Sequence, residues 1–171
     1  MTSTPQSGHD GPYGAPIRIA DLTVLPEWID YNGHMNARYY GFAFQDQAEK
    51  FLERDLGFGA SYVKEEGMGP FVLQKNIGYM QELIEGEPFH ITMRLLDHDA
   101  KRMHFYFQMI SDRSGKICAS AEYLNMNIDL QHRKPAPFPD WLKARLEQMQ
   151  SEHASLERPA NVGAPIGIRR K

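Results

Sequence analysis

A short segment near the N-terminus joins a carboxylate to the start of a predicted helix. Asp30 precedes Asn36, a good N-cap, and Ala37 would begin the helix. The first amides of a helix lack intrahelical acceptors and carry partial positive charge, so an amide near Ala37 could polarise a carbonyl oxygen. A carboxylate one short loop away could attack the carbonyl carbon or activate a water to do so. Gly33 would permit a positive φ and close approach of a ligand to the backbone.

Each residue of this segment also has a purely structural interpretation. Asp30 could form an Asx-turn with Asn32 or Gly33. We expect His34 to bond backbone groups and hold the loop, and Asn36 to cap the helix whatever the chemistry. Aromatic side chains flank the segment and could serve the core or a subunit interface rather than a ligand: Trp28, Tyr31, Tyr39 and Tyr40.

The elements around the segment follow from hydrophobic periodicity. A β-branched run at 17–26 predicts a strand, and apolar residues at helical spacing predict a helix over 37–56 that stops at Gly57. A short helical turn is expected at 61–67. The period then becomes two, which predicts strands near 69–80, 88–98, 102–111 and 116–129 with short antiparallel connections. A last helix is predicted at 139–152, with Pro139 in its first turn and a stripe of Phe138, Leu142, Leu146 and Met149.

This order of elements predicts an α+β fold. One long helix followed by an antiparallel meander can be buried only by laying the helix across a curved sheet. The other surface or the edge of that sheet needs a cover, so a dimer is expected. We divide the chain into a flexible N-terminal segment at 1–15, one domain at 16–153 and a C-terminal tail at 154–171, because both ends are rich in Gly and Pro.

Composition excludes several classes of protein. The chain has 171 residues, 42% of them hydrophobic and 24% charged, with a net charge of -3, so no broad cationic surface for nucleic acid is expected. It has neither a signal-like N-terminus nor a run of about 18 apolar residues, so no membrane association is expected. The single cysteine, Cys118, excludes an internal disulfide or a thiolate-rich metal site and suits a reducing cytoplasm. It is expected to be buried and inert.

The motif and its setting resemble one enzyme family. The pattern D-x-x-G-H-x-N at 30–36, followed by an aromatic-rich long helix and a four-strand meander, resembles the hotdog-fold acyl-CoA thioesterases of the 4-hydroxybenzoyl-CoA thioesterase-like branch. The resemblance covers about residues 16–135. Within that branch, VLPEWIDYNGHMN with the downstream LGFGASYV is similar to thioesterases of carnitine and betaine catabolism.

The resemblance implies a fold, an activity and a set of site residues. The fold would be a hotdog, a long central helix wrapped by a five-stranded antiparallel sheet, here with an added C-terminal helix. Asp30 would be the catalytic nucleophile or general base, and the Ala37 amide would polarise the thioester carbonyl. Gly33, His34 and Asn36 would shape the site. Homodimers or homotetramers with active sites at the dimer interface are implied, and no metal or cofactor, since coenzyme A is part of the substrate.

Further candidates concern the substrate. Asn76 and Tyr79 lie on the strand that often faces the acyl group in this family. A betainyl group carries a quaternary ammonium, which aromatic faces bind, so Trp28, Tyr31, Tyr39 and Tyr40 would supply them. Four basic residues could meet the phosphates of CoA: Lys101, Arg102, Arg133 and Lys134.

Two alternatives stay open at this point. One is a hotdog enoyl-CoA hydratase or dehydratase, whose loop resembles D-x-N-x-x-H, although His34 falls one position too early for that pattern. The other is a non-catalytic acyl-binding hotdog protein.

Overall fold

A long helix lies at the centre of the molecule. The computed structural model describes residues 7–168. Helix α1 spans Ala37–Phe51 and continues as a π-helical turn, Leu52–Leu56, which ends at Gly57 with φ 67°. Its apolar stripe, including Tyr40, Phe44 and Phe51, is buried. The predicted helix over 37–56 is therefore confirmed, and the left-handed conformation of Gly57 explains its end.

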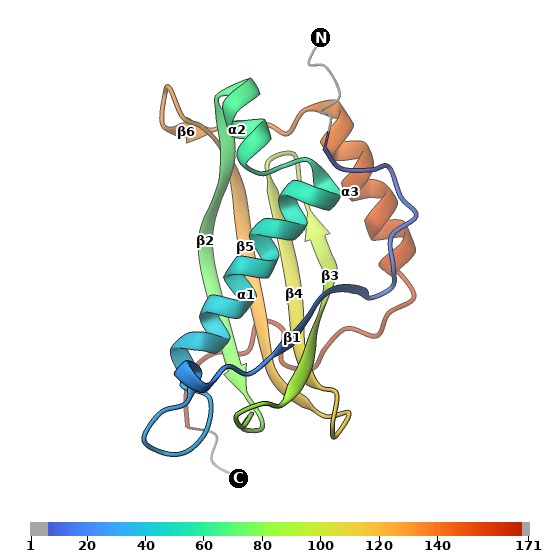
Figure 1. Ribbon diagram of the computed structural model, residues 1–171. Helices are drawn as coiled ribbons and strands as arrows, with labels where there is room; N and C mark the ends of the chain where they lie inside the picture. The colour runs from blue at the N-terminus through green and yellow to red at the C-terminus, as the bar shows by residue number, and fades with distance from the viewer. Residues whose placement is uncertain (1–6, 169–171) are drawn as a thin grey trace.

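An antiparallel sheet curls around α1 (Figure 1). Its strands are β1 (Ile17–Thr23), β2 (Met68–Tyr79), β3 (Pro88–His98), β4 (Arg102–Ser111) and β5 (Ile117–Asp129), in the order β1-β3-β4-β5-β2. Two differences from the sequence prediction are local. The first strand ends at Thr23 because Pro26–Trp28 forms a 3₁₀ turn, and a two-residue strand β6 (Lys134–Pro135) pairs with β5.

An irregularity in β2 decides which of its side chains face the helix. The register with β5 shifts between Val72 and Gln74, as expected for a β-bulge. Pro70 and Val72 face α1 before the shift, and Ile77 and Tyr79 face it afterwards. Even-numbered residues of the first half of β2 and odd-numbered residues of the second half therefore face α1.

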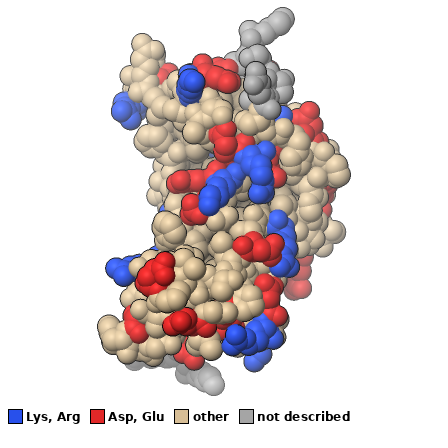
Figure 2. All heavy atoms as spheres, in the orientation of Figure 1, with Lys and Arg blue, Asp and Glu red and all other residues tan. Residues whose placement is uncertain are grey.

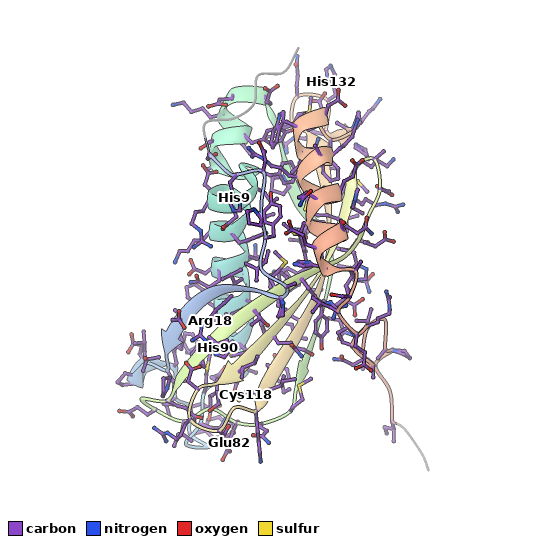
Figure 3. All side chains as sticks on the ribbon, turned by 90° about the vertical axis from the view of Figure 1, so that its right-hand side faces the viewer. His9, Arg18, Glu82, His90, Cys118 and His132 are labelled. Carbon is purple, nitrogen blue, oxygen red and sulfur yellow. The ribbon has the colours of Figure 1, made fainter. Side chains whose placement is uncertain are left out.

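A second layer of contacts is made by α3 and the N-terminal segment. Helix α2 spans Ala60–Glu66 and α3 spans Asp140–His153, with the predicted stripe of α3 buried. Figure 3 shows α3 with His9 on the segment beside it. Tyr13 on that segment is only 7% exposed, and Arg145 of α3 donates to Asp10 and to the Leu56 carbonyl. This packing of residues 7–15 was not predicted, and residues 1–6 lie outside the described chain.

The C-terminal tail crosses the face of the sheet that lies away from α1. The Asn161 side chain accepts from Tyr106 Oη at 2.8 Å and donates to Ser120 Oγ at 2.9 Å. The Gly163 amide donates to Glu122. The described part of the tail is therefore held by side chains of β4 and β5.

Surface charge and hydropathy agree with the composition. Acidic and basic side chains are mixed over the face shown in Figure 2. Among the helices of residues 7–168, none has the length and apolar character needed to cross a membrane. Cys118 is buried, and its burial raises the pKa of the thiol, as expected for an inert cysteine.

Candidate active site

The loop before α1 folds around the Asp30 carboxylate. Oδ1 accepts from the Asn32 amide at 2.8 Å, which is an Asx-turn, and Oδ2 accepts from the Asn36 side-chain amide at 3.3 Å. Gly33 has φ 80° and its amide donates to the Asp30 carbonyl at 2.9 Å. The Asp30 amide donates to the His34 carbonyl at 3.0 Å, so the loop closes on itself. The carboxylate is half-buried and held in place by its own loop.

The first amide of α1 is free to donate a hydrogen bond to a ligand. Asn36 caps the helix, since its Oδ1 accepts from the Arg38 amide at 3.1 Å. Among residues 7–168, no hydrogen-bond acceptor takes the Ala37 N–H. Asn36 therefore contacts both the carboxylate and the helix start. The arrangement could hold a carbonyl oxygen at the Ala37 amide with a carboxylate nearby.

His34 has the loop-holding geometry expected for it. Its Nδ1 lies 3.2 Å from the Met35 carbonyl oxygen and is the donor in that contact. The ring is half-buried. His34 therefore holds the loop through its contact with a backbone carbonyl.

The four aromatic residues of the segment separate into different environments. Trp28 stacks on Tyr39, with ring centroids 5.5 Å apart and planes 16° apart. Tyr40 is in the core, and its hydroxyl accepts from the Leu83 amide. Tyr31 is 96% exposed. Within one chain, the four aromatic faces do not converge, because Tyr40 is buried in the core and Tyr31 is exposed.

Of the two candidates on β2, only Tyr79 lies at this site. Tyr79 Oη donates to the Ala37 carbonyl at 3.4 Å, and its ring meets Tyr40 edge-on at 5.3 Å. Asn76 points to the opposite face, where its amide donates to the Ala164 carbonyl of the tail. Alternation along the strand places the two residues on opposite faces, and among the described residues Asn76 contacts the tail.

The basic candidates lie far from this loop. Arg102 is the first residue of β4 and is bound to Asp99. Burial acts to raise the pKa of Asp99, but hydrogen bonds from the Arg102 side chain and from the Lys101 and Arg102 amides outweigh it, and the pKa falls to about 2. Lys134 lies on β6 and Arg133 just before it. Figure 1 shows β6 and α2 at the end of the molecule opposite the start of α1. Strand β6 and the start of α1 therefore lie at opposite ends of one chain.

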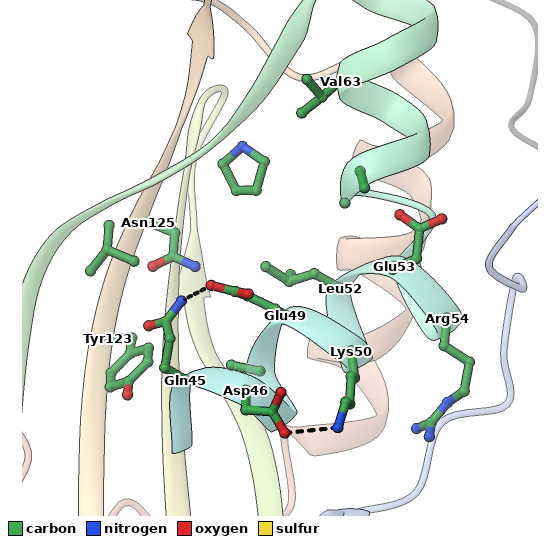
Figure 4. A pocket seen from close by; sticks show the side chains of 15 residues that line it. Gln45, Asp46, Glu49, Lys50, Leu52, Glu53, Arg54, Val63, Tyr123 and Asn125 are labelled. Atoms are coloured by element: carbon green, nitrogen blue, oxygen red, sulfur yellow. Dashed lines mark hydrogen bonds and ion pairs between the residues drawn. The ribbon is translucent and has the colours of Figure 1, made fainter. Parts of the chain in front are cut away.

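A cavity of about 710 Å³ opens between α1 and the strands β2 and β5, and sequence analysis missed it. Two of the residues that line it, Tyr123 and Asn125 (Figure 4), each have a side-chain oxygen that is buried out of reach of the cavity and has no hydrogen-bond partner among the described residues. Burial raises the pKa of Tyr123. The sequence signal was weak, because Tyr123 and Asn125 are two of several polar residues on β5.

Comparison with known proteins identifies the class. The family model described as the thioesterase-like superfamily matches residues 24–146. The chain therefore belongs to this superfamily of thioester hydrolases. The resemblance to hotdog-fold thioesterases seen in the sequence is confirmed.

Two curated relatives narrow the comparison. The chain is 32% identical over 148 residues to a protein of Pseudomonas aeruginosa named betainyl-CoA thioesterase, covering 86% of this chain and 92% of that one. It is also 32% identical over 155 residues to a Rhizobium meliloti protein named L-carnitine dehydrogenase/betainyl-CoA thioesterase. That alignment covers 91% of this chain, which spans only 31% of the longer protein.

Solved structures agree on the fold. A hypothetical protein of Staphylococcus aureus, solved in complex with CoA, has a TM-score of 0.82 at 23% identity, covering 93% of this chain and all (100%) of that one. A putative thioesterase of Pseudomonas putida has a TM-score of 0.74 at 23% identity, covering 91% and 98%. The hotdog arrangement expected from the sequence is therefore confirmed.

Proposed function

We propose that the protein is an acyl-CoA thioesterase that hydrolyses betainyl-CoA to betaine and CoA, with Asp30 at the centre of the reaction. The observation that carries this proposal is the position of Asp30 beside the helix start. The same side chain, Asn36, binds the carboxylate and caps the helix whose Ala37 amide is unpaired. The names of the two relatives support the acyl group.

The reaction follows from these two groups. A thioester carbonyl oxygen at the Ala37 amide gains a hydrogen bond and the favourable field of the helix end as negative charge develops. Asp30 then attacks the carbonyl carbon, giving a mixed anhydride that water hydrolyses, or it takes a proton from an attacking water. Either route consumes one water and releases the acid and the CoA thiol. The proposed reaction uses no metal or other cofactor, and CoA enters with the substrate.

The proposed function also includes association of two copies of the chain. β2 is an edge strand of twelve residues, and three consecutive apolar residues on it are 39–48% exposed: Phe71, Val72 and Leu73. A long apolar edge strand favours pairing with another strand. We propose that two copies pair through β2 and that the active sites lie at this interface. Pairing of dimers into tetramers is compatible with the same edge contact.

The proposed assembly also suggests which basic residues would contact the phosphates of CoA. Antiparallel pairing of β2 brings the β6 end of one copy towards the α1 start of the other, so Lys101, Arg133 and Lys134 could meet phosphates across the interface. The proposal includes a cytoplasmic location, which suits a chain with one buried free thiol.

The test is release of free thiol from a panel of acyl-CoAs by wild type and by Asp30→Asn. The panel contains betainyl, short aliphatic, long aliphatic and aromatic thioesters, and an enoyl-CoA assayed for hydration. We expect betainyl-CoA to be the best substrate and kcat/KM of the variant to fall by two or more orders of magnitude, roughly the contribution of one acid–base group or more. Absence of hydrolysis by folded wild type, or full activity of Asp30→Asn, would contradict the proposal.

A further inference from the structure

The loop between β2 and β3, residues 80–87, contacts the Asp30 loop from inside the molecule. The carbonyl of Leu83 accepts from the Met35 amide at 2.8 Å. Both residues are buried, so this hydrogen bond is shielded from water. Met35 directly precedes Asn36, which contacts Asp30 and caps α1. The β2–β3 loop therefore holds the Asp30 loop at the point where the chain enters the helix.

Tyr40 joins the same β2–β3 loop to the helix. Its hydroxyl oxygen accepts from the Leu83 amide at 3.0 Å, and its side chain is buried. Tyr40 follows Ala37 by three residues, so the two lie on one face of α1, about one turn apart. Burial raises the pKa of Tyr40 to about 12, so the hydroxyl stays neutral near pH 7. Leu83 thus links the start of α1, through two hydrogen bonds, to the backbone that precedes the helix.

The β2–β3 loop is itself anchored to the ends of two strands. The Met80 and Gln81 amides both donate to the Cys118 carbonyl of β5, at 2.8 and 3.1 Å. The Gly86 amide donates to the Val24 carbonyl, just beyond β1, at 2.9 Å. Because the loop is held on both sides of Leu83, its position is transmitted to the segment that enters α1.

Glu87 fixes the far end of the loop with its side chain. It is buried, and its two carboxyl oxygens accept from the Ile84 amide and from the Ser111 hydroxyl of β4. Among residues 7–168 no basic side chain forms an ion pair with it. A buried carboxyl group is costly unless its oxygens are hydrogen-bonded, so these two contacts define one position for the group.

We propose that Tyr40 and Glu87 are positioning residues for thioester hydrolysis. Acting through the β2–β3 loop, they fix the distance between the Asp30 carboxylate and the Ala37 amide. This inference rests on the proposed thioesterase function and extends it to residues that do not touch the substrate. A displacement of about 1 Å in a reacting group can cost up to about two orders of magnitude in rate, so the backbone at Met35 has to be held rigidly.

The first test is kinetic and uses the best acyl-CoA of the panel. In Tyr40→Phe the Leu83 amide loses its acceptor while the aromatic ring stays in the core. We expect kcat to fall by about tenfold and KM to stay within about twofold of wild type, because only the geometry needed in the transition state is lost.

The matched control for this variant is Tyr106→Phe. Tyr106 is also a buried tyrosine, and its hydroxyl donates to Asn161 in the tail, away from the β2–β3 loop. We expect kcat of Tyr106→Phe to equal that of wild type. An equal fall of kcat in both variants would mean that the loss reflects removal of any buried hydroxyl, and the positioning role would be wrong.

A double-mutant cycle tests whether Tyr40 acts through Asp30. Without the carboxylate, the rate no longer depends on its distance from the helix amide. Tyr40→Phe should therefore change the residual kcat of Asp30→Asn by less than about twofold. The same tenfold loss in both backgrounds would overturn the proposal, since Tyr40 would then act independently of the carboxylate.

Glu87→Gln tests the loop from its other end and leaves the core tyrosine in place. An amide has one oxygen, so it cannot keep accepting from Ile84 through one oxygen and from Ser111 through another. We expect kcat to fall several-fold in the otherwise wild-type chain and to change by less than about twofold in Asp30→Asn. Wild-type kcat in Glu87→Gln would remove Glu87 from the proposal.

Amide hydrogen exchange gives a readout that does not depend on activity. We expect the Leu83 and Met35 amides to exchange at least about tenfold faster in Tyr40→Phe than in wild type, and to be unchanged in Tyr106→Phe. Unchanged exchange at both amides, or faster exchange with wild-type kcat, would overturn the positioning role. A wild-type protein that hydrolyses no thioester would instead remove the function on which the inference rests, whatever the exchange rates.

Discussion

At the scale of single residues, the structural contacts of Asp30 are compatible with the catalytic role proposed for it. Its Asx-turn to Asn32 and its contact with Asn36 engage one lone pair on each oxygen, and each oxygen of a carboxylate has two. The remaining lone pairs are available to a water or a substrate. The turn therefore aims the carboxylate rather than consuming it, as catalysis by a positioned group requires.

Asn36 can be tested without removing the cap. In Asn36→Asp the side chain still accepts from the Arg38 amide, because Asp and Asn cap equally well. It no longer donates to Asp30 and instead places a second carboxylate beside it. We expect the melting temperature to stay within about 2 °C of wild type and kcat/KM to fall by about tenfold or more.

The control for this variant is Asn36→Ser, which keeps the cap and adds no charge, and should lose less activity. Differential scanning calorimetry and thiol release on the same samples give both quantities. Wild-type activity in Asn36→Asp would mean that the side chain acts only as a cap.

At the scale of elements, the parts of the fold that depend on local periodicity were predicted and the parts that depend on contacts were not. The bounds 88–98 and 102–111 of β3 and β4 match the prediction because strict alternation and flanking turns define them. The contact of Asn161 with Tyr106, which seats the tail, joins residues 55 apart and leaves no periodic signal. The packing of Tyr13, in the N-terminal segment, against α3 likewise leaves no periodic signal in the sequence.

The candidate site residues also separate into those that local sequence reveals and those that only the folded chain brings together. Asp30, Asn36 and Ala37 lie within one short segment, so their spacing was informative. Asn76 and Tyr79 could not be assigned to faces, since the bulge after Val72 changes the parity of β2. Tyr123 lies about ninety residues beyond the motif at 30–36, and only the sheet order brings β5 beneath α1.

His153 connects α3 to β3 and to the N-terminal segment, and this packing depends on pH. His153 of α3 accepts from the Leu95 amide of β3 at 3.0 Å through Nδ1, and its Nε2 donates to the Gly14 carbonyl at 2.7 Å. These contacts define a neutral ring, and burial lowers the pKa of His153 below its ordinary 6.5. Below about pH 6.5 the unfolded chain therefore binds a proton that the folded chain does not, and stability falls as the pH falls.

Replacement of His153 should remove that part of the pH dependence. We expect wild type to lose stability below pH 6.5 with a contribution of at most about 1.4 kcal/mol per pH unit from this group, and His153→Gln to lack this contribution. Urea unfolding at pH 7.5, 6.0 and 5.0 measures the difference. His132→Gln, at an exposed position, should keep the wild-type slope. Equal slopes for wild type and His153→Gln would show that the ring is not the titrating group.

At the scale of the whole molecule, the edge of β2 is the surface that a single chain leaves unfinished. The tail contacts the outer face of the sheet and α1 covers the inner face, but Phe71 and Leu73 stay exposed on the edge strand. The Asp30 loop lies near one end of β2, and the cavity between α1, β2 and β5 lies near the other end. We expect pairing of two copies to cover the exposed edge.

That pairing should fail when the edge carries a charge. A lysine on an edge strand opposes strand pairing, because its ammonium must stay in water. In Leu73→Lys, at a position that is 48% exposed, we expect intact folding by circular dichroism, a monomeric mass and loss of most thioesterase activity. Ile117→Lys is the control: it is 38% exposed on β5, which pairs on both sides, and should keep the wild-type mass and activity. Sedimentation velocity at micromolar concentration measures the mass. A folded monomer with full activity would show that one chain makes a complete site, whereas a dimeric Leu73→Lys would place the interface elsewhere.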